Sequence, residues 1–302
     1  TLGSRSVAIG SGALNTQNLT TATDTYNVAI GDSAGLSVTT GVHNTLIGGG
    51  AGDALTNSSH NVALGYNALG TDTLGAKSTA LGRSALGSQN FTTATDAYNT
   101  AVGYDAGNAV TTGLLNTLIG GLAGDALTDA DVNVAVGANA LSSDTLGSKS
   151  VAIGYKVLET QNFTTATDTY NTAVGYGAGA AITTGLYNTL VGGEAGKSLT
   201  DVERNVAIGA FTLDKEELGQ RNTAVGYAAL STQDFNTATD AHNTAIGNEA
   251  GLNLTTGKFN VFLGSVSGGN GTITGTHNTG LGMETLYALT SGTDNVIIGY
   301  QS

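Results

Sequence analysis

The stretch Asn99-Thr100-Ala101-Val102-Gly103 decides the fold of this chain. Its second residue is β-branched and its fourth is aliphatic, and side chains in a β-strand point alternately to its two faces. The closing glycine suits a tight corner or a backbone with positive φ. We therefore interpret these five residues as one short strand followed by a sharp turn.

Seventeen copies of this motif cover the chain, and each copy marks one coil. Their glycines recur in a cycle of one longer and three shorter intervals, as from Gly10 to Gly31, Gly48, Gly65 and Gly82. The chain thus holds four roughly 72-residue units of four coils each, with one extra residue in the last unit. A helical interpretation fails because every coil carries glycine and β-branched residues. The sequence predicts an all-β, parallel β-solenoid that forms a single repeat domain over residues 1–302.

Positions within the coil suggest where the core lies. The second and fourth motif residues are β-branched or aliphatic, which fits a pleated, buried surface. The third is mostly Ala, and we expect a second short strand later in the coil, for example over residues 38–40 or 109–112. So short a coil has little interior, and we therefore expect several chains to share one axis, as a parallel homotrimer.

Composition excludes several classes of protein. The 302 residues include no cysteine and no proline, so disulfides and thiolate metal sites are ruled out. The net charge of -13 makes nucleic acids and anionic membranes poor partners. No apolar run reaches the 18 or more residues that a membrane span needs, so we expect no membrane insertion by this segment. Neither end carries an evident cap, and we expect a segment of a longer fibre.

Strings such as Asn222-Thr223-Ala224-Val225-Gly226-Tyr227 and Ser150-Val151-Ala152-Ile153-Gly154 resemble two related classes of protein. One is the head of trimeric autotransporter adhesins, and the other is the repeat region of phage-type tail fibres. The resemblance implies a left-handed β-roll, a homotrimer and a place outside the cell, on a cell surface or a virion. The adhesin-head coil is usually shorter than the coils of this chain, which favours the tail-fibre class. The implied partners are a second and third copy of the chain and a host-cell, glycan or matrix receptor.

The first coil of each unit is four residues longer than the others and is predicted to protrude as a turn. Aromatic rings beside carboxylates bind sugars or cations, although an Asx-type turn explains the aspartates equally well. The candidate receptor contacts in these turns are Asp24, Tyr26, Asp96, Tyr98, Asp168, Tyr170, Asp240 and His242. Consecutive aspartates of this row lie four coils, roughly 19 Å, apart if strands stack at the usual spacing.

Two other functions remain open. A column of threonines eight residues after the motif glycine, such as Thr56, Thr128 and Thr272, would suit an ice-binding solenoid. The third function is a tailspike-type glycan hydrolase, which would require carboxylates that break the repeat. The acidic run Asp214-Lys215-Glu216-Glu217 does break it, but we interpret this run as a solvated loop.

Two other motifs give weaker indications of a functional site. His43 and His60 lie one coil apart, and two ligands are too few for a structural metal site. Residues 192–198 imitate a phosphate-binding loop but lack its first glycine. We therefore predict a non-catalytic attachment fibre without a cofactor, a metal or catalytic residues.

Overall fold

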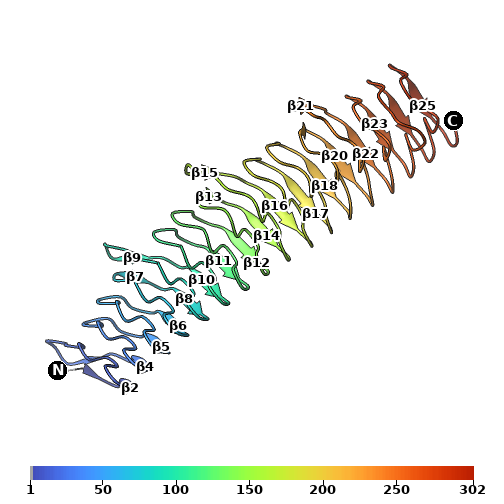
Figure 1. Ribbon diagram of the computed structural model, residues 1–302. Helices are drawn as coiled ribbons and strands as arrows, with labels where there is room; N and C mark the ends of the chain where they lie inside the picture. Colours follow the sequence, from blue (N-terminus) through green and yellow to red (C-terminus); the bar gives the residue numbers. More distant parts are fainter. Residues whose placement is uncertain (1–2) are drawn as a thin grey trace. The chain divides into compact units, whose positions relative to one another are not determined.

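The computed structural model describes residues 3–302 and confirms an all-β, parallel β-solenoid of about 17 turns (Figure 1). Within this described range no residue is helical, and hence no helix is long and apolar enough to cross a membrane. The chain divides into two compact units. The first runs to Lys149 and includes Phe163–Asp168, and the second comprises Ser150–Asn162 and Thr169–Ser302.

Each motif forms a three-residue strand. Within each of the two compact units, which are larger than the 72-residue units of the sequence, neighbouring strands pair in parallel and in register. In the first unit these strands are β2 (Val7–Ile9), β4 (Val28–Ile30), β5 (Thr45–Ile47), β6 (Val62–Leu64), β8 (Thr79–Leu81), β10 (Thr100–Val102), β11 (Thr117–Ile119) and β12 (Val134–Val136). In the second they are β14 (Val151–Ile153), β16 (Thr172–Val174), β17 (Thr189–Val191), β18 (Val206–Ile208), β20 (Thr223–Val225), β22 (Thr244–Ile246), β23 (Val261–Leu263), β24 (Thr279–Leu281) and β25 (Val296–Ile298).

Two-residue strands form a second set of parallel pairs at the longer coils. They are β1 (Gly3–Ser4) with β3 (Thr23–Asp24), β7 (Gly75–Ala76) with β9 (Thr95–Asp96), β13 (Gly147–Ser148) with β15 (Thr167–Asp168) and β19 (Gly219–Gln220) with β21 (Thr239–Asp240).

The second strand expected over residues 38–40 and 109–112 is not formed: residues 39–40 and 111–112 are bends, and residue 109 belongs to a turn. The backbone N–H groups of Thr39 and Gly41 both donate to the same carbonyl, that of Thr56, at 3.0 and 3.3 Å. Two donors that share one acceptor cannot continue as a ladder of paired strands.

The third motif residue points into the coil, and the second and fourth point out of it. Ala101 and Leu118 are fully buried, whereas the outward Leu64 and Ile208 are 46% and 39% exposed. The expectation that the second and fourth positions line a buried surface is therefore wrong for the single chain. Alternation defines two faces of a strand but does not say which one is inside. We call the outward second and fourth motif positions, which are the first and last residues of each three-residue strand, the outer strip.

The first motif residue builds a buried ladder of asparagines. The side-chain oxygen of Asn116 accepts the backbone N–H of Asn133 at 2.9 Å, and its Nδ2 donates to the carbonyl of Ala130 at 2.8 Å. Asn27, Asn44 and their equivalents repeat the pattern. Where the motif begins with one of these buried asparagines, the coil is thus tied to the next by its side chain.

Tight corners give the coils an unusual backbone. Gly103 has φ of 142°, and a Cβ there would lie 2.4 Å from the carbonyl oxygen of Gly120, so only glycine fits, as predicted. In addition, 39 non-glycine residues of the described chain have φ between 48° and 63°. Left-handed backbone costs an L-residue roughly 1–2 kcal/mol, so the repeated contacts of the coil must offset this strain.

Candidate contact surface on the protruding turns

The protruding turns end in the aspartates predicted as receptor contacts. Asp24, Asp96, Asp168 and Asp240 each close the short strand of their own turn. Each strand pairs with the two-residue strand of the preceding coil, which holds the turn in place. The four turns therefore present the same geometry at equivalent points of the repeat.

A basic residue from the preceding coil pairs with each of these aspartates. The N–O distances are 3.1 Å for Arg5–Asp24, 2.6 Å for Lys77–Asp96, 2.5 Å for Lys149–Asp168 and 2.9 Å for Arg221–Asp240. Sequence reasoning missed these four partners, although a basic residue recurs at intervals of 72 residues, five positions before the motif glycine. The side chains are 37–61% exposed, and such surface pairs contribute up to about 1 kcal/mol each.

The pair in the second repeat shows the electrostatics most clearly. The Lys77 ammonium donates to Asp96 Oδ2 at 2.6 Å and to Tyr98 Oη at 2.9 Å. The hydrogen bond to Asp96, followed by that to Tyr98, raises the pKa of Lys77 to about 12. Lys77 is therefore a permanent cation at neutral pH, and Asp96 and Tyr98 already have a donor between them.

The aromatic residues of the turns are covered by their neighbours in adjacent coils. The Arg5 guanidinium lies 5.5 Å from the centroid of the Tyr26 ring, and the His43 ring stacks on Tyr26 at 5.4 Å. Tyr170 stacks on Tyr187 at 5.7 Å, and His242 stacks on Phe259 at 5.5 Å. The faces of Tyr26 are thus occupied, and a ligand would meet its edge and hydroxyl group.

These aromatic and basic residues belong to one column that runs through every coil. It is formed by the residue directly before the motif Asn or Ser, and we call it the outer column. All of its members have left-handed backbone: Arg5, Tyr26, His43, His60, Lys77, Tyr98, Leu115, Val132, Lys149, Tyr170, Tyr187, Arg204, Arg221, His242, Phe259, His277 and Asp294. The left-handed conformation turns these side chains out of the coil, and rings stack where aromatic members follow one another, as in Tyr26, His43 and His60.

The His43 and His60 rings stack at 5.0 Å within this column, which confirms that they are neighbours. The described residues contain no group of three or more His, Cys, Asp or Glu side chains placed to hold a metal ion. The metal interpretation therefore gains no third ligand.

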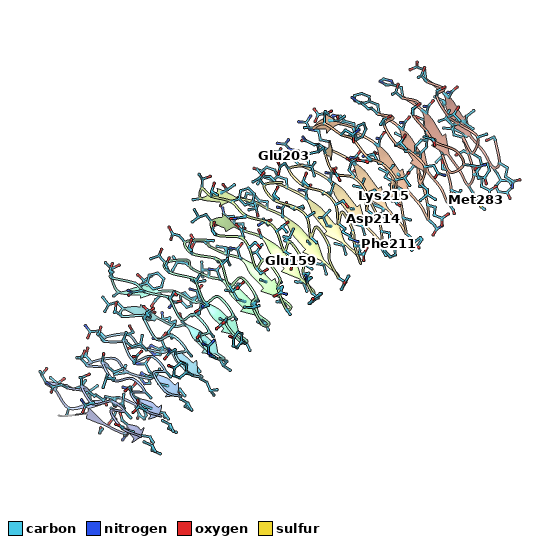
Figure 2. All side chains as sticks on the ribbon, viewed as in Figure 1. Glu159, Glu203, Phe211, Asp214, Lys215 and Met283 are labelled. Atoms are coloured by element: carbon cyan, nitrogen blue, oxygen red, sulfur yellow. The ribbon has the colours of Figure 1, made fainter. Side chains whose placement is uncertain are left out.

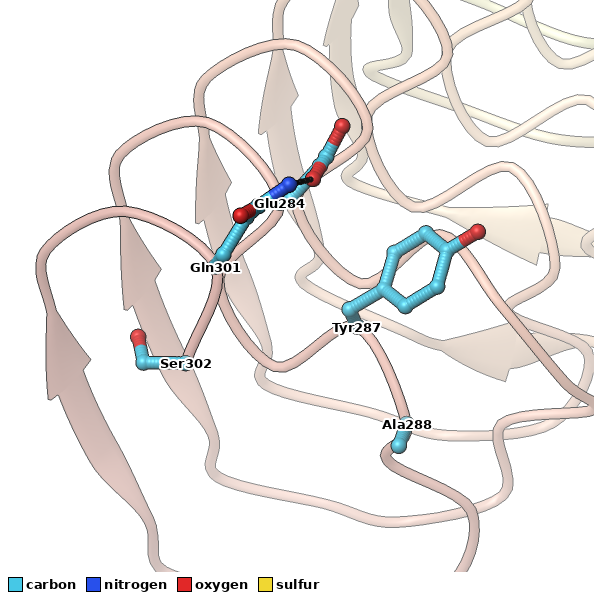
Figure 3. A pocket seen from close by; sticks show the side chains of 5 residues that line it. All are labelled: Glu284, Tyr287, Ala288, Gln301 and Ser302. Atoms are coloured by element: carbon cyan, nitrogen blue, oxygen red, sulfur yellow. Dashed lines mark hydrogen bonds between the residues drawn. The ribbon is translucent and has the colours of Figure 1, made fainter.

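Hollows on the surface are shallow. One of about 480 Å³ lies beside the turn of the second repeat, between His60, Lys77 and Asp96. Another of about 450 Å³ lies in the last two coils, where Gln301 donates to Glu284 at 2.7 Å beside Tyr287 (Figure 3). The second hollow has no cationic group among its lining residues, so its polar groups are less varied than those at Lys77.

The threonine column proposed for ice binding holds neighbouring coils together instead. Thr56 Oγ1 donates to the carbonyl of Thr73, and Thr128 Oγ1 donates to that of Thr145, both at 3.0 Å. Thr272 is not a member of the column, because Ile273 takes that place and accepts the backbone N–H of Thr255 at 2.9 Å. Hydroxyl groups engaged in this way are not free to order water.

The acidic run before Gly226 is solvated only in part, since Lys215 and Glu217 are exposed but Glu216 is not. Glu216 is fully buried, and its carboxylate accepts the backbone N–H groups of Leu218, Gly219 and Phe235 and the side-chain amide of Gln233. Burial raises the pKa of Glu216, and these hydrogen bonds partly oppose the shift. Asp72 occupies the equivalent place in the second repeat with the same kinds of partner, so the carboxylate is structural.

Comparisons of the chain with family models, with curated proteins and with solved structures find no match. The resemblance to adhesin heads and tail fibres therefore remains a prediction from the repeated motif. The geometry of the described coils defines a β-solenoid repeat protein with a repeated charged turn.

Proposed function

We propose that the chain is a structural and adhesive segment of an extracellular, trimeric attachment fibre without catalytic activity. The observation that carries this proposal is the outer strip. Its two columns contain only Val, Thr, Ile and Leu along all 17 strands, and in the single chain no other layer covers them. An apolar face of this extent favours association with another protein surface.

A second and third copy of the chain are the partners that suit this strip best. The strip carries no charged residue, so identical copies bring no charge repulsion at their contact despite the net charge of -13. Parallel copies would place equivalent coils side by side around a common axis. The left-handed coil, the four-unit organisation and the trimer implied by the resemblance are part of this proposal.

The protruding turns are the proposed receptor contacts. Four of them recur along the chain, and each presents an aspartate, a basic partner and an aromatic edge. Repetition along one chain and among three chains would convert weak single contacts into strong attachment. The receptor chemistry that fits is polar, such as a cell-surface glycan or a matrix protein.

Binding of the labelled chain to glycan- and matrix-coated surfaces tests this role. The variant replaces Asp24, Asp96, Asp168 and Asp240 by Asn, which removes four surface ion pairs and leaves the coils intact. We expect surface binding to fall by at least about tenfold, because the losses multiply across a multivalent contact. Unchanged binding by this variant would remove the turns from the proposal.

One observation favours ice binding as a second candidate. The outer strip is a regular parallel face in which threonine occupies the second motif position at, for example, Thr100, Thr172 and Thr244. Thermal hysteresis in a freezing-point measurement would support this candidate. The hydrolase alternative has no such support, since Glu216 is buried and its oxygens are engaged.

A further inference from the structure

The third repeat departs from the other three at one place on the surface. Two small residues, Gly177 and Ala180, lie on one coil, while the coils before and after it carry charged pairs. The pairs are Lys156 with Glu159 at 3.0 Å and Lys197 with Glu194 at 2.9 Å. The equivalent residues of the second repeat are Asp105, Asn108, Ser84, Gly87, Asp125 and Leu122.

These departures create a notch of about 150 Å³, all within the second unit. Gly177 and Ala180 form its floor, and no atom lies within 4 Å of the point where Gly177 would carry a Cβ. Lys156 and Glu159 line one rim. A wider hollow of about 440 Å³ continues from it over Ala181 and Thr200. Glu159 and Asp214, labelled in Figure 2, belong to the coils on either side of this surface.

Tyr176 forms the wall of the notch and has one open ring face. Its side chain is among the most exposed of the tyrosines, at 60%. The ring stacks on Tyr155 at 5.7 Å on one side. The next coil places Gly193 at the equivalent position, and no atom lies within 4 Å of its Cβ point. In contrast to Tyr26, Tyr176 therefore offers a free face to a ligand.

The charges around the notch balance one another. Hydrogen bonds from Lys156 to Glu159 and from Lys197 to Glu194 raise the pKa of both lysines, so an ammonium group stands beside each of the two acidic side chains. An ammonium has three donors, so each lysine keeps donors beyond its pair. Alternating donors and acceptors suit vicinal hydroxyl groups, and the net charge of -13 disfavours an acidic ligand.

We propose that this notch binds one uncharged pyranose residue of a glycan. The apolar C–H face of the sugar packs on the free face of Tyr176, whose π-electrons attract polarised C–H groups. The carboxylates of Glu159 and Glu194 accept sugar hydroxyl protons, and the ammonium groups of Lys156 and Lys197 donate to sugar oxygens. Small-molecule sites are usually lined by apolar and aromatic side chains with a small number of polar groups, and this notch has that composition.

The second repeat provides the matched comparison. Tyr104 corresponds to Tyr176 and Gly121 to Gly193, but Asp105 and Asn108 stand where the notch has Gly177 and Ala180. The Arg83 guanidinium also lies 5.2 Å from the Tyr104 ring centroid and 3.4 Å from Asp105. In the second repeat the side chains of Asp105 and Asn108 therefore stand where the notch has glycine and alanine.

Titration by saturation-transfer NMR tests the site in the full chain. The probes are the methyl glycosides of glucose, galactose, mannose and N-acetylglucosamine, with glucuronate as the acidic comparison. We expect at least one neutral glycoside to bind with a Kd on the order of millimolar, as is usual for so small a ligand. The double variant Gly177→Asp, Ala180→Asn fills the notch with the residues of the second repeat, so it should fold.

The double variant should weaken binding at least about tenfold, and Tyr176→Ala at least about fivefold, while Tyr104→Ala should change it less than about twofold. Equal binding by the filled variant, no binding of any neutral glycoside, or binding of glucuronate alone would each overturn the proposal. The site lies within one chain and away from the protruding turns. Its failure would therefore leave the trimeric fibre untouched, and failure of the fibre would leave this site intact.

Discussion

The side chain of Leu118 occupies the space that a side chain on Gly124 would need. Leu118 Cδ2 lies 2.8 Å from the point where Gly124 would carry a Cβ, and Gly107 on the opposite side is equally close to Leu118 Cδ1, at 2.6 Å. Gly124 also has φ of 55°. In some coils with Ala at the strand centre, such as Ala80, the equivalent position holds a buried leucine, Leu86, whereas the coil of Ala101 has Gly107 there. No coil carries leucine at both the strand centre and the corner, so the two positions are alternatives.

This relationship predicts a strong coupling between the two positions. Gly124→Leu alone should destabilise the chain by roughly 2–4 kcal/mol, because two leucines would claim one space. Adding Leu118→Ala gives the Ala and Leu combination of the next coil, Ala135 with Leu141, and should recover part of that loss, although Leu127 Cδ1 also lies 2.8 Å from the Gly124 Cβ point. Urea unfolding of the parent, both single variants and the double variant measures the coupling, and additive effects would contradict it.

The buried asparagine ladder predicts a large effect of a small truncation. Asn116→Ala leaves the carbonyl of Ala130 and the N–H of Asn133 without their partners. Unsatisfied buried groups cost about 1–3 kcal/mol each, so we expect a loss of about 2–5 kcal/mol in the free energy of unfolding. Thr117→Val is the control, since other coils carry Val there, and it should change stability by less than about 0.5 kcal/mol. Similar losses for both variants would contradict the ladder.

Left-handed backbone at a β-branched residue predicts a stabilising substitution. Val132 has φ of 60°, a conformation that asparagine tolerates far better than valine. Val132→Asn should raise the free energy of unfolding by about 1 kcal/mol. Val42→Asn, at a position without positive φ, should give no gain. Thermal unfolding of the two variants beside the parent would refute the account if Val132→Asn lowered the melting temperature.

Glu216 predicts a pH dependence of known sign. Burial raises its pKa in the folded chain, so the folded state holds its proton at pH values where the unfolded state has released it. Its contribution to stability is complete below the unfolded pKa and is lost as pH rises through the folded pKa. Each tenfold difference in proton affinity corresponds to about 1.4 kcal/mol.

Relative to Glu216→Gln, the parent should therefore become less stable as pH rises above about 4. Urea unfolding of both proteins across that range measures the difference. Glu216→Asp, which restores the residue found at Asp72 and Asp144, checks that the coil tolerates a carboxylate. A difference that stays constant, or that grows in favour of the parent at higher pH, would contradict a raised pKa.

The motif predicted the strands and the number of coils correctly because each strand is a local feature with a glycine at its end. Gly103 predicts its corner directly, since no other residue fits there. Which face of the strand points inward was not predictable in this way. Thr100 and Val102 look as suited to a core as Ala101, and only the curvature of the coil turns them outward.

The candidate site was predictable in part. Period counting located Asp96 and Tyr98 on an exposed turn, and both are exposed. Their partner Lys77 lies in the preceding coil, so only a comparison of equivalent positions in all four repeats would have found it. The burial of Glu216 was not predicted, because a run of charged residues ordinarily marks a solvated loop. Glu216 makes the same kind of hydrogen bond as Asp72, and the two residues lie two repeats apart in the chain.

The outer strip is the surface that we propose joins three copies of the chain. Light scattering after size exclusion measures the solution mass of the whole chain without labels or partners. We expect a mass of about 90 kDa, three times the chain mass of 29.9 kDa. We also expect that Val174→Glu, which places a charge in the strip, shifts the mass towards a single chain. A parent mass of about 30 kDa would contradict the trimer and leave the exposed strip to another partner or surface.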